Sequence, residues 1–203
     1  MRDIIVYMQP REWGKTDMAV EVERRPFSTA EYHRMAQVGI LNEDDRVELI
    51  HGEVITMSPA GPARSACVKR INAILHARIG RSAIVSIQDP ISLDTGSEPQ
   101  PDIALLMPRD DYYSKRLPAP SEVLLVIEVA DTSAGYDRNV KLPLYAGAGI
   151  PEVWLVGLPE KRVEAYSQPK DGSYQSVRRV GRGTALSPEG VPVVALTVDE
   201  IFG

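Results

Sequence analysis

The longest apolar run in the chain reads Val123-Leu124-Leu125-Val126-Ile127, and it continues through Glu128 to Val129. A second run, Asp102-Ile103-Ala104-Leu105-Leu106, precedes it, and a third, Glu152-Val153-Trp154-Leu155-Val156, follows it. Such nearly continuous apolar runs are typical of strands that are buried on both faces. We therefore expect these three segments to form the interior of one sheet.

A helix is predicted between the last two of these strands, from about Arg138 to Gly147. Strand, helix and strand then form a β-α-β unit, in which the two strands are parallel. Pro143 fits easily only in the first turn of a helix. The helix is therefore expected to start near Asn139 or to be kinked.

Further elements are predicted on both sides of this unit. Ser28 and Glu31 form a capping box for a short helix that ends near Gly39, and helical spacing predicts a second helix from Pro62 to about Ile79. His51-Gly52 and Lys170-Asp171-Gly172 each separate two β-rich runs and predict hairpins. The fold class is thus α/β (α+β), a central mixed β-sheet flanked by helices, with N-terminal and C-terminal β-hairpins.

Length and composition indicate one globular domain. The chain has 203 residues, of which 43% are hydrophobic and 25% charged, values close to those of ordinary folded proteins. We expect a single domain at residues 26–203, preceded by an N-terminal arm at residues 1–25. The formal charge of −5 excludes a basic nucleic-acid coat, so contacts with nucleic acid must be local or assisted by a metal.

Targeting and redox signals are sparse. Cys67 is the one cysteine, which excludes an intramolecular disulfide and a cysteine zinc cage. No signal peptide is recognisable, and the longest apolar run is far shorter than the roughly 20 residues of a membrane span. The sequence predicts a protein of the reducing cytoplasm with no membrane segment.

Two acidic residues interrupt the apolar runs. Asp102 opens one run and Glu128 lies near the end of the next. Buried carboxylates that lie close together repel one another unless a cation compensates them. Mg²⁺ prefers oxygen ligands and retains several waters, so two carboxylates and the main-chain carbonyl of Val129 would suit it.

Lys141 follows Glu128 on the predicted crossover helix, from which its ammonium group can return to the acids. There it can orient a metal-activated water or stabilise the charge that develops when water attacks a phosphodiester. In a regular helix Asp137 and Tyr145 would share its face. The alternative is that Asp102, Glu128 and Lys141 form a buried salt-bridge cluster with a structural role.

Four segments together carry a family resemblance. They are Arg46-Val47-Glu48-Leu49-Ile50-His51-Gly52-Glu53-Val54, Glu98-Pro99-Gln100-Pro101-Asp102-Ile103-Ala104, Val126-Ile127-Glu128-Val129 and the stretch from Tyr136 to Val156. In this order they resemble the Uma-type restriction endonuclease family of the PD-(D/E)XK nuclease superfamily. The resemblance extends from about Phe27 to Phe202.

The resemblance implies a restriction-endonuclease-like core and hydrolysis of DNA with Mg²⁺ or Mn²⁺. It implies that Asp102 and Glu128 are metal ligands, that Lys141 is the catalytic lysine and that Glu48 is an accessory acid. The chain departs from the usual patterns at Ala130, which stands where the superfamily has its lysine, and at Ser65 and Gly157, where family members often have histidine and aspartate.

Several alternatives stay open. A catalytically silent nuclease-fold module for nucleic-acid binding or protein assembly would use the same fold. Glu48 can equally face solvent from its hairpin, where Glu53 is expected as a surface acid. Asp137 is expected to cap a helix or to support the site. A homodimer is predicted if both strands of a duplex are cut.

Other polar and aromatic residues are given structural roles. The histidines lack metal-ligand spacing, and Tyr145 and Trp154 are expected in the core. Two groups of basic residues have two open interpretations, a stripe that contacts phosphate and, as the preferred one, a solvated face. They are Lys69, Arg70, Arg78 and Arg81, and Arg178, Arg179 and Arg182.

Overall fold

The computed structural model of the chain describes residues 24–42, 44–93 and 96–203. The predicted N-terminal arm lies outside this part, except for its last two residues. The elements are α1 (Thr29–Gln37), β1 (Val47–Ile50), β2 (Glu53–Thr56), α2 (Pro62–Ile79), β3 (Ile84–Ile87), β4 (Ile103–Leu106), η1 (Pro120–Glu122), β5 (Val123–Ala130), α3 (Ala134–Tyr136), η2 (Asp137–Lys141), α4 (Leu142–Gly147), β6 (Glu152–Gly157), β7 (Arg162–Lys170), β8 (Ser173–Val180), β9 (Ala185–Leu186), β10 (Leu196–Thr197) and α5 (Val198–Phe202).

The main sheet has six strands in the order β3-β4-β5-β6-β7-β8. β5 and β6 are parallel, whereas the other neighbouring pairs are antiparallel. The helical crossover between β5 and β6 confirms the predicted β-α-β unit. The predicted mixed sheet flanked by helices is confirmed.

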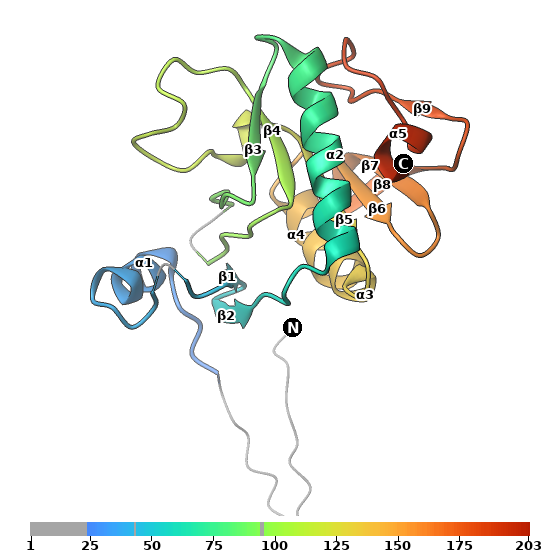
Figure 1. Cartoon of the computed structure of the whole chain (residues 1–203). Coiled ribbons are helices and arrows are strands. Elements are labelled where there is room, and N and C mark those ends of the chain that lie inside the picture. Colours follow the sequence, from blue (N-terminus) through green and yellow to red (C-terminus); the bar gives the residue numbers. More distant parts are fainter. Residues whose placement is uncertain (1–23, 43, 94–95) are drawn as a thin grey trace, which may run out of the picture.

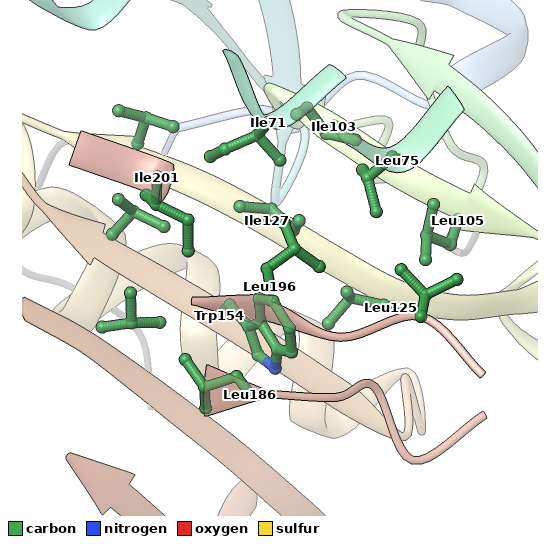
Figure 2. Close-up of a cluster of buried hydrophobic side chains, with 14 of the residues drawn as sticks. Ile71, Leu75, Ile103, Leu105, Leu125, Ile127, Trp154, Leu186, Leu196 and Ile201 are labelled. Carbon is green, nitrogen blue, oxygen red and sulfur yellow. The ribbon is translucent and has the colours of Figure 1, made fainter. Parts of the chain in front are cut away.

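Helices pack against both faces of this sheet. α2 runs across one face (Figure 1), and its Ile71 and Leu75 lie in a buried cluster with Ile127 and Trp154. Figure 2 shows that α5 and the β9–β10 pair close the same cluster through Ile201, Leu186 and Leu196. On the other face, α4 contributes to a second buried cluster, which contains Leu142, Tyr145, Ala104, Val126 and Val153. The core predicted for Trp154 and Tyr145 is confirmed.

Both predicted hairpins are present. β1 and β2 form a separate two-stranded sheet, and their turn places His51 at φ 51° and Gly52 at φ 77°. The backbone of Gly52 also passes close to Pro26, where a Cβ atom would lie 2.4 Å from the Pro26 Cβ. In the turn between β7 and β8, Asp171 and Gly172 also have positive φ. These conformations are those of tight hairpin turns.

The crossover helix differs from the prediction. It starts at Ala134, several residues earlier than expected, and its middle part, η2, is a π-helical turn followed by α4. Pro143 lacks an amide hydrogen and lies in the first turn of α4, where that hydrogen is not required. The helix therefore starts earlier than predicted, and its hydrogen-bond pattern changes before Pro143.

The termini of the fold add two observations. Ser28 and Glu31 cap α1 reciprocally, as predicted. β9, β10 and α5 were not predicted, although Thr197 and Glu200 form a second capping box at the start of α5. No helix in the described ranges combines the length and the apolar character that crossing a membrane requires.

Candidate active site

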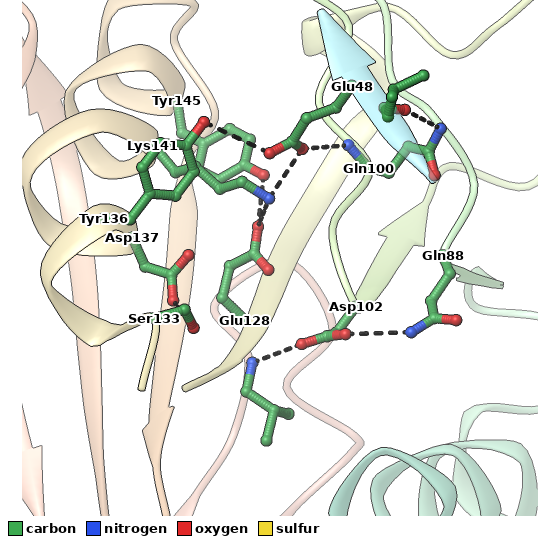
Figure 3. Close-up of polar contacts among 12 residues, drawn as sticks. Glu48, Gln88, Gln100, Asp102, Glu128, Ser133, Tyr136, Asp137, Lys141 and Tyr145 are labelled. Carbon is green, nitrogen blue, oxygen red and sulfur yellow. Dashed lines mark hydrogen bonds and ion pairs between the residues drawn. The ribbon is translucent and has the colours of Figure 1, made fainter. Parts of the chain in front are cut away.

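The register of the sheet brings Asp102 and Glu128 together. Ile103 of β4 is paired with Ile127 of β5, so the next position along each strand places Asp102 opposite Glu128. Their exposed fractions are 1% and 2%, and Figure 3 shows the Glu128 carboxylate directed toward Lys141 and the Asp102 carboxylate, near it, bonded to Gln88. The structure thus juxtaposes the two acids that the sequence analysis singled out.

Lys141 reaches this position from the last residue of η2. Its Nζ atom lies 3.2 Å from Oε1 of Glu128 and 3.0 Å from Oε2 of Glu48. Tyr145, one turn further on, donates a hydrogen bond of 2.7 Å from its hydroxyl to the same Glu128 oxygen. The crossover helix therefore presents both a charge and a hydroxyl to the acid of β5.

Glu48 is buried in β1 with an exposed fraction of 3%, so the alternative of a solvent-facing acid is wrong. Its carboxylate accepts a hydrogen bond of 3.1 Å from the amide of Gln100 and one of 3.5 Å from the hydroxyl of Tyr136. An isolated bridge between Leu49 and Glu98 fixes the hairpin to the segment that precedes Asp102. The contact between the hairpin and this segment positions the Glu48 carboxylate beside Lys141.

Arg64, which the sequence analysis did not single out, forms a bidentate ion pair with Asp102. It lies in the first turn of α2, and its Nε and Nη2 atoms donate to Oδ2 and Oδ1 of Asp102 at 3.1 and 3.0 Å. The amide of Val129 donates to Oδ2 at 2.9 Å, and Gln88 donates to Oδ1 at 3.3 Å. A planar guanidinium that engages both oxygens is the strongest common partner of a carboxylate.

Asp137 completes the acidic side of the site. It is 5% exposed and accepts a hydrogen bond of 2.8 Å from the hydroxyl of Ser133, one turn earlier. It is the C-cap residue of α3 and the first residue of η2, within one continuous helical run. Its burial beside Lys141 agrees with the expectation of a supporting residue.

Burial and mutual repulsion shift the protonation of these groups. Burial, with a further contribution from Asp102, raises the pKa of Glu128 to about 7 although Lys141 opposes the shift. Burial also raises the pKa of Asp137. For Lys141, burial alone would lower the pKa, but Glu128 and Glu48 raise it above its ordinary value. The acids thus favour the charged form of the lysine, whereas burial opposes the ionisation of Glu128 and Asp137.

The donor set fits a divalent cation. Four buried carboxylates, those of Glu48, Asp102, Glu128 and Asp137, face two cations, Lys141 and Arg64. In the described ranges, no three His, Cys, Asp or Glu side chains are grouped to hold a metal by themselves. Two carboxylates with a main-chain carbonyl and water are instead the oxygen-rich, partly hydrated set that Mg²⁺ accepts.

Other candidate residues lie outside this cluster. His33 contacts Glu98, with Nε2 2.7 Å from Oε2, at a pocket beside α1. Glu53 is an exposed hairpin residue that pairs with Arg24, as expected of a surface acid. The buried acid of β6, Glu152, bonds the Trp154 indole and the Glu189 amide. The described structure thus assigns these residues to separate contacts.

The fold defines the class of protein first. A crystal structure from Anabaena variabilis, described as "a putative nuclease belonging to DUF820", superposes with a TM-score of 0.66 at 19% sequence identity. The match covers 87% of this chain and 98% of that chain. This likeness establishes a nuclease-like fold.

The sequence then places the chain within a family. It belongs to the Uma2 family, described as "Putative restriction endonuclease", whose profile matches residues 29–199. The predicted Uma-type resemblance is confirmed. No curated protein matches the chain.

Proposed function

We propose that this chain is a divalent-metal-dependent endonuclease that hydrolyses DNA phosphodiester bonds by means of a metal-activated water. The observation that carries the proposal is the position of Lys141, whose ammonium group bridges Glu48 and Glu128 beside Asp102. Asp102 and Glu128 would supply carboxylate ligands of the kind that a nuclease needs for its metal.

Each residue has a distinct part in the proposed reaction. Asp102, Glu128 and the carbonyl of Val129 would hold Mg²⁺ or Mn²⁺. When bound, the ion would lower the pKa of a water molecule and polarise the phosphate. Lys141 would stabilise the negative charge that grows on the phosphate oxygens during attack.

Glu48 and Tyr145 would position the other groups. Glu48 holds the lysine from the opposite side and raises its pKa, so that the lysine keeps its proton. Tyr145 occupies Oε1 of Glu128, which fixes the orientation of that carboxylate. Both would act through their neighbours, without contact with the phosphate.

Cleavage assays on unselected DNA test this proposal. Wild type should nick or cut a pool of supercoiled plasmids and single-stranded circles in Mg²⁺ or Mn²⁺, and EDTA should abolish the activity. Asp102→Asn and Glu128→Gln should be inactive. Glu152→Gln is the matched control, because Glu152 is a buried acid of the same sheet with contacts of its own, and this variant should cleave like wild type.

One observation favours a second candidate, the catalytically silent module for nucleic-acid binding or assembly. Arg64 already satisfies both oxygens of Asp102, so the structure has a metal-free means of compensating this acid. A silent module would bind partners without binding Mn²⁺ at millimolar concentration. Binding of Mn²⁺ that depends on Asp102 would decide in favour of the nuclease.

A homodimer is part of the nuclease proposal. Cutting both strands of a duplex requires two active sites, which a symmetric pair of chains supplies. Sedimentation of the active protein measures this directly. A monomer that makes double-strand cuts without pairing would contradict it.

A further inference from the structure

Three arginines surround one buried carboxylate on the strands next to the site. Glu164 of β7 is 2% exposed, and its Oε1 atom lies 3.3 Å from Arg138, 3.2 Å from Arg162 and 3.5 Å from Arg179. The hydroxyl of Tyr166 donates to the other oxygen. We call Arg138, Arg162 and Arg179 the arginine cluster.

The arginine cluster holds more positive charge than its acid compensates. Its side chains are 34%, 42% and 58% exposed, so their guanidinium groups are accessible although Glu164 is not. Burial alone would raise the pKa of Glu164, but Tyr166 and the arginines bring it below its ordinary value. Glu164 is therefore ionised, and the cluster has two positive charges in excess.

One donor in the cluster is also unsatisfied. The Nε atom of Arg162 is buried and has no hydrogen-bond partner in the described structure. Buried donors are nearly always paired, so an orphaned one calls for an explanation. A bound anion that reoriented the exposed end of Arg162 would give its Nε atom a hydrogen-bond acceptor.

The cluster lies on the same face of the sheet as the proposed catalytic groups. Glu128 of β5 is paired with Leu155 of β6, Leu155 with Glu164 of β7, and Glu164 with Arg179 of β8. Directly paired residues direct their side chains to one face. Neighbouring strands are about 4.8 Å apart, so the backbones at Glu128 and Glu164 are separated by about 10 Å.

The crossover helix links the two groups from above the sheet. Arg138 and Lys141 both lie in η2, three residues apart. Arg138 contacts Glu164, whereas Lys141 contacts Glu128. One helical turn therefore directs a cation to each of the two acids on this face.

We propose that the arginine cluster binds a phosphate group of the nucleic-acid backbone next to the bond that is cut. This inference rests on the proposed function, because it assumes that the anion is nucleic acid. Guanidinium groups suit phosphate, since their planar donors engage two oxygens at once. Glu164 preorganises the arginines and yields part of their hydrogen bonding to the phosphate.

The test is the salt dependence of DNA binding in EDTA, where no metal-dependent cleavage occurs. Fluorescence anisotropy of a labelled random-sequence duplex gives the affinity of wild type and of the R162Q/R179Q double variant. Each lost phosphate contact should reduce the slope of log affinity against log salt by about 0.9. Because the arginine cluster is proposed to bind one phosphate group, the double variant should lose about 0.9 from the slope.

Arg178 provides the matched control. It is adjacent to Arg179 on β8 and carries the same charge, but it pairs with Ala165 and belongs to the opposite face of the sheet. Arg178→Gln should leave the salt slope unchanged. R162K/R179K should retain the slope, because lysine keeps the charge, and thermal unfolding shows which variants are folded.

A fourth variant separates phosphate binding from a purely structural role. Glu164→Gln removes the charge that competes with phosphate, so it should increase DNA affinity. Equal salt slopes for wild type and folded R162Q/R179Q, or no DNA binding by wild type, would overturn the inference. DNA binding with the expected slopes but without cleavage in Mg²⁺ would instead refute the nuclease and leave the arginine cluster established.

Discussion

Arg64 and Asp102 form a bidentate ion pair that joins the first turn of α2 to the residue that precedes β4. Asp102 is 1% and the Arg64 side chain 15% exposed, so the pair is largely removed from solvent. Burial alone would lower the pKa of Arg64, but the negative charge of Asp102 raises it above its ordinary value. The guanidinium thus donates hydrogen bonds to both oxygens of the acid that we propose as a metal ligand.

This pair predicts opposite effects on stability and on metal binding. Arg64→Met should destabilise the metal-free protein by about 3 kcal/mol, because it leaves a buried carboxylate without its cation. The same variant should bind Mn²⁺ more tightly, since no guanidinium competes for Asp102. Thermal unfolding with and without Mn²⁺ measures both, and an Mn²⁺-induced shift no larger than that of wild type would refute the competition.

Lys141 should affect turnover far more than metal binding. Replacement by alanine removes the charge that stabilises the attacked phosphate, for which a loss of about 10²- to 10³-fold in turnover is typical. Mn²⁺ affinity should be retained, because the proposed ligands stay in place. Equal cleavage by wild type and a folded Lys141→Ala variant would eliminate this role.

Glu128 should make the metal-free protein less stable as the pH rises. Its pKa is about 7 in the folded chain and about 4.5 when unperturbed. Between these values the folded chain keeps a proton that the unfolded chain has released, so the free energy of unfolding falls with increasing pH. Urea unfolding in EDTA from pH 4.5 to 7 should show this fall in wild type and a smaller one in Glu128→Gln; identical curves would contradict it.

The sheet and the paired acids were predictable from local sequence. The three apolar runs identified the central strands, and acids within them stood out because ionised carboxylates are rarely buried without compensation. Lys141 was found through its place on the crossover helix. Tyr145 was expected in the core, and its contact with Glu128 adds a polar role that an aromatic residue within an apolar pattern does not reveal.

Contacts between residues far apart in the sequence could not be predicted from local sequence patterns. Arg64 lies 38 positions before Asp102, and an arginine in the first turn of a helix resembles any solvated residue. The burial of Glu48 depends on how its hairpin docks on Gln100, which alternation within the hairpin does not encode. The π-helical turn has Pro143 as its sequence signal, and the start of α5 has the capping box of Thr197 and Glu200.

Calorimetric titration of Mn²⁺ into the protein tests the proposed metal site most directly, because it requires no knowledge of the DNA target. Wild type should bind Mn²⁺, and both Asp102→Ala and the isosteric Asp102→Asn should lose binding, whereas Glu152→Gln should bind like wild type. If folded Asp102 variants bind Mn²⁺ as wild type does, Asp102 is not a metal ligand and the account of the site is wrong.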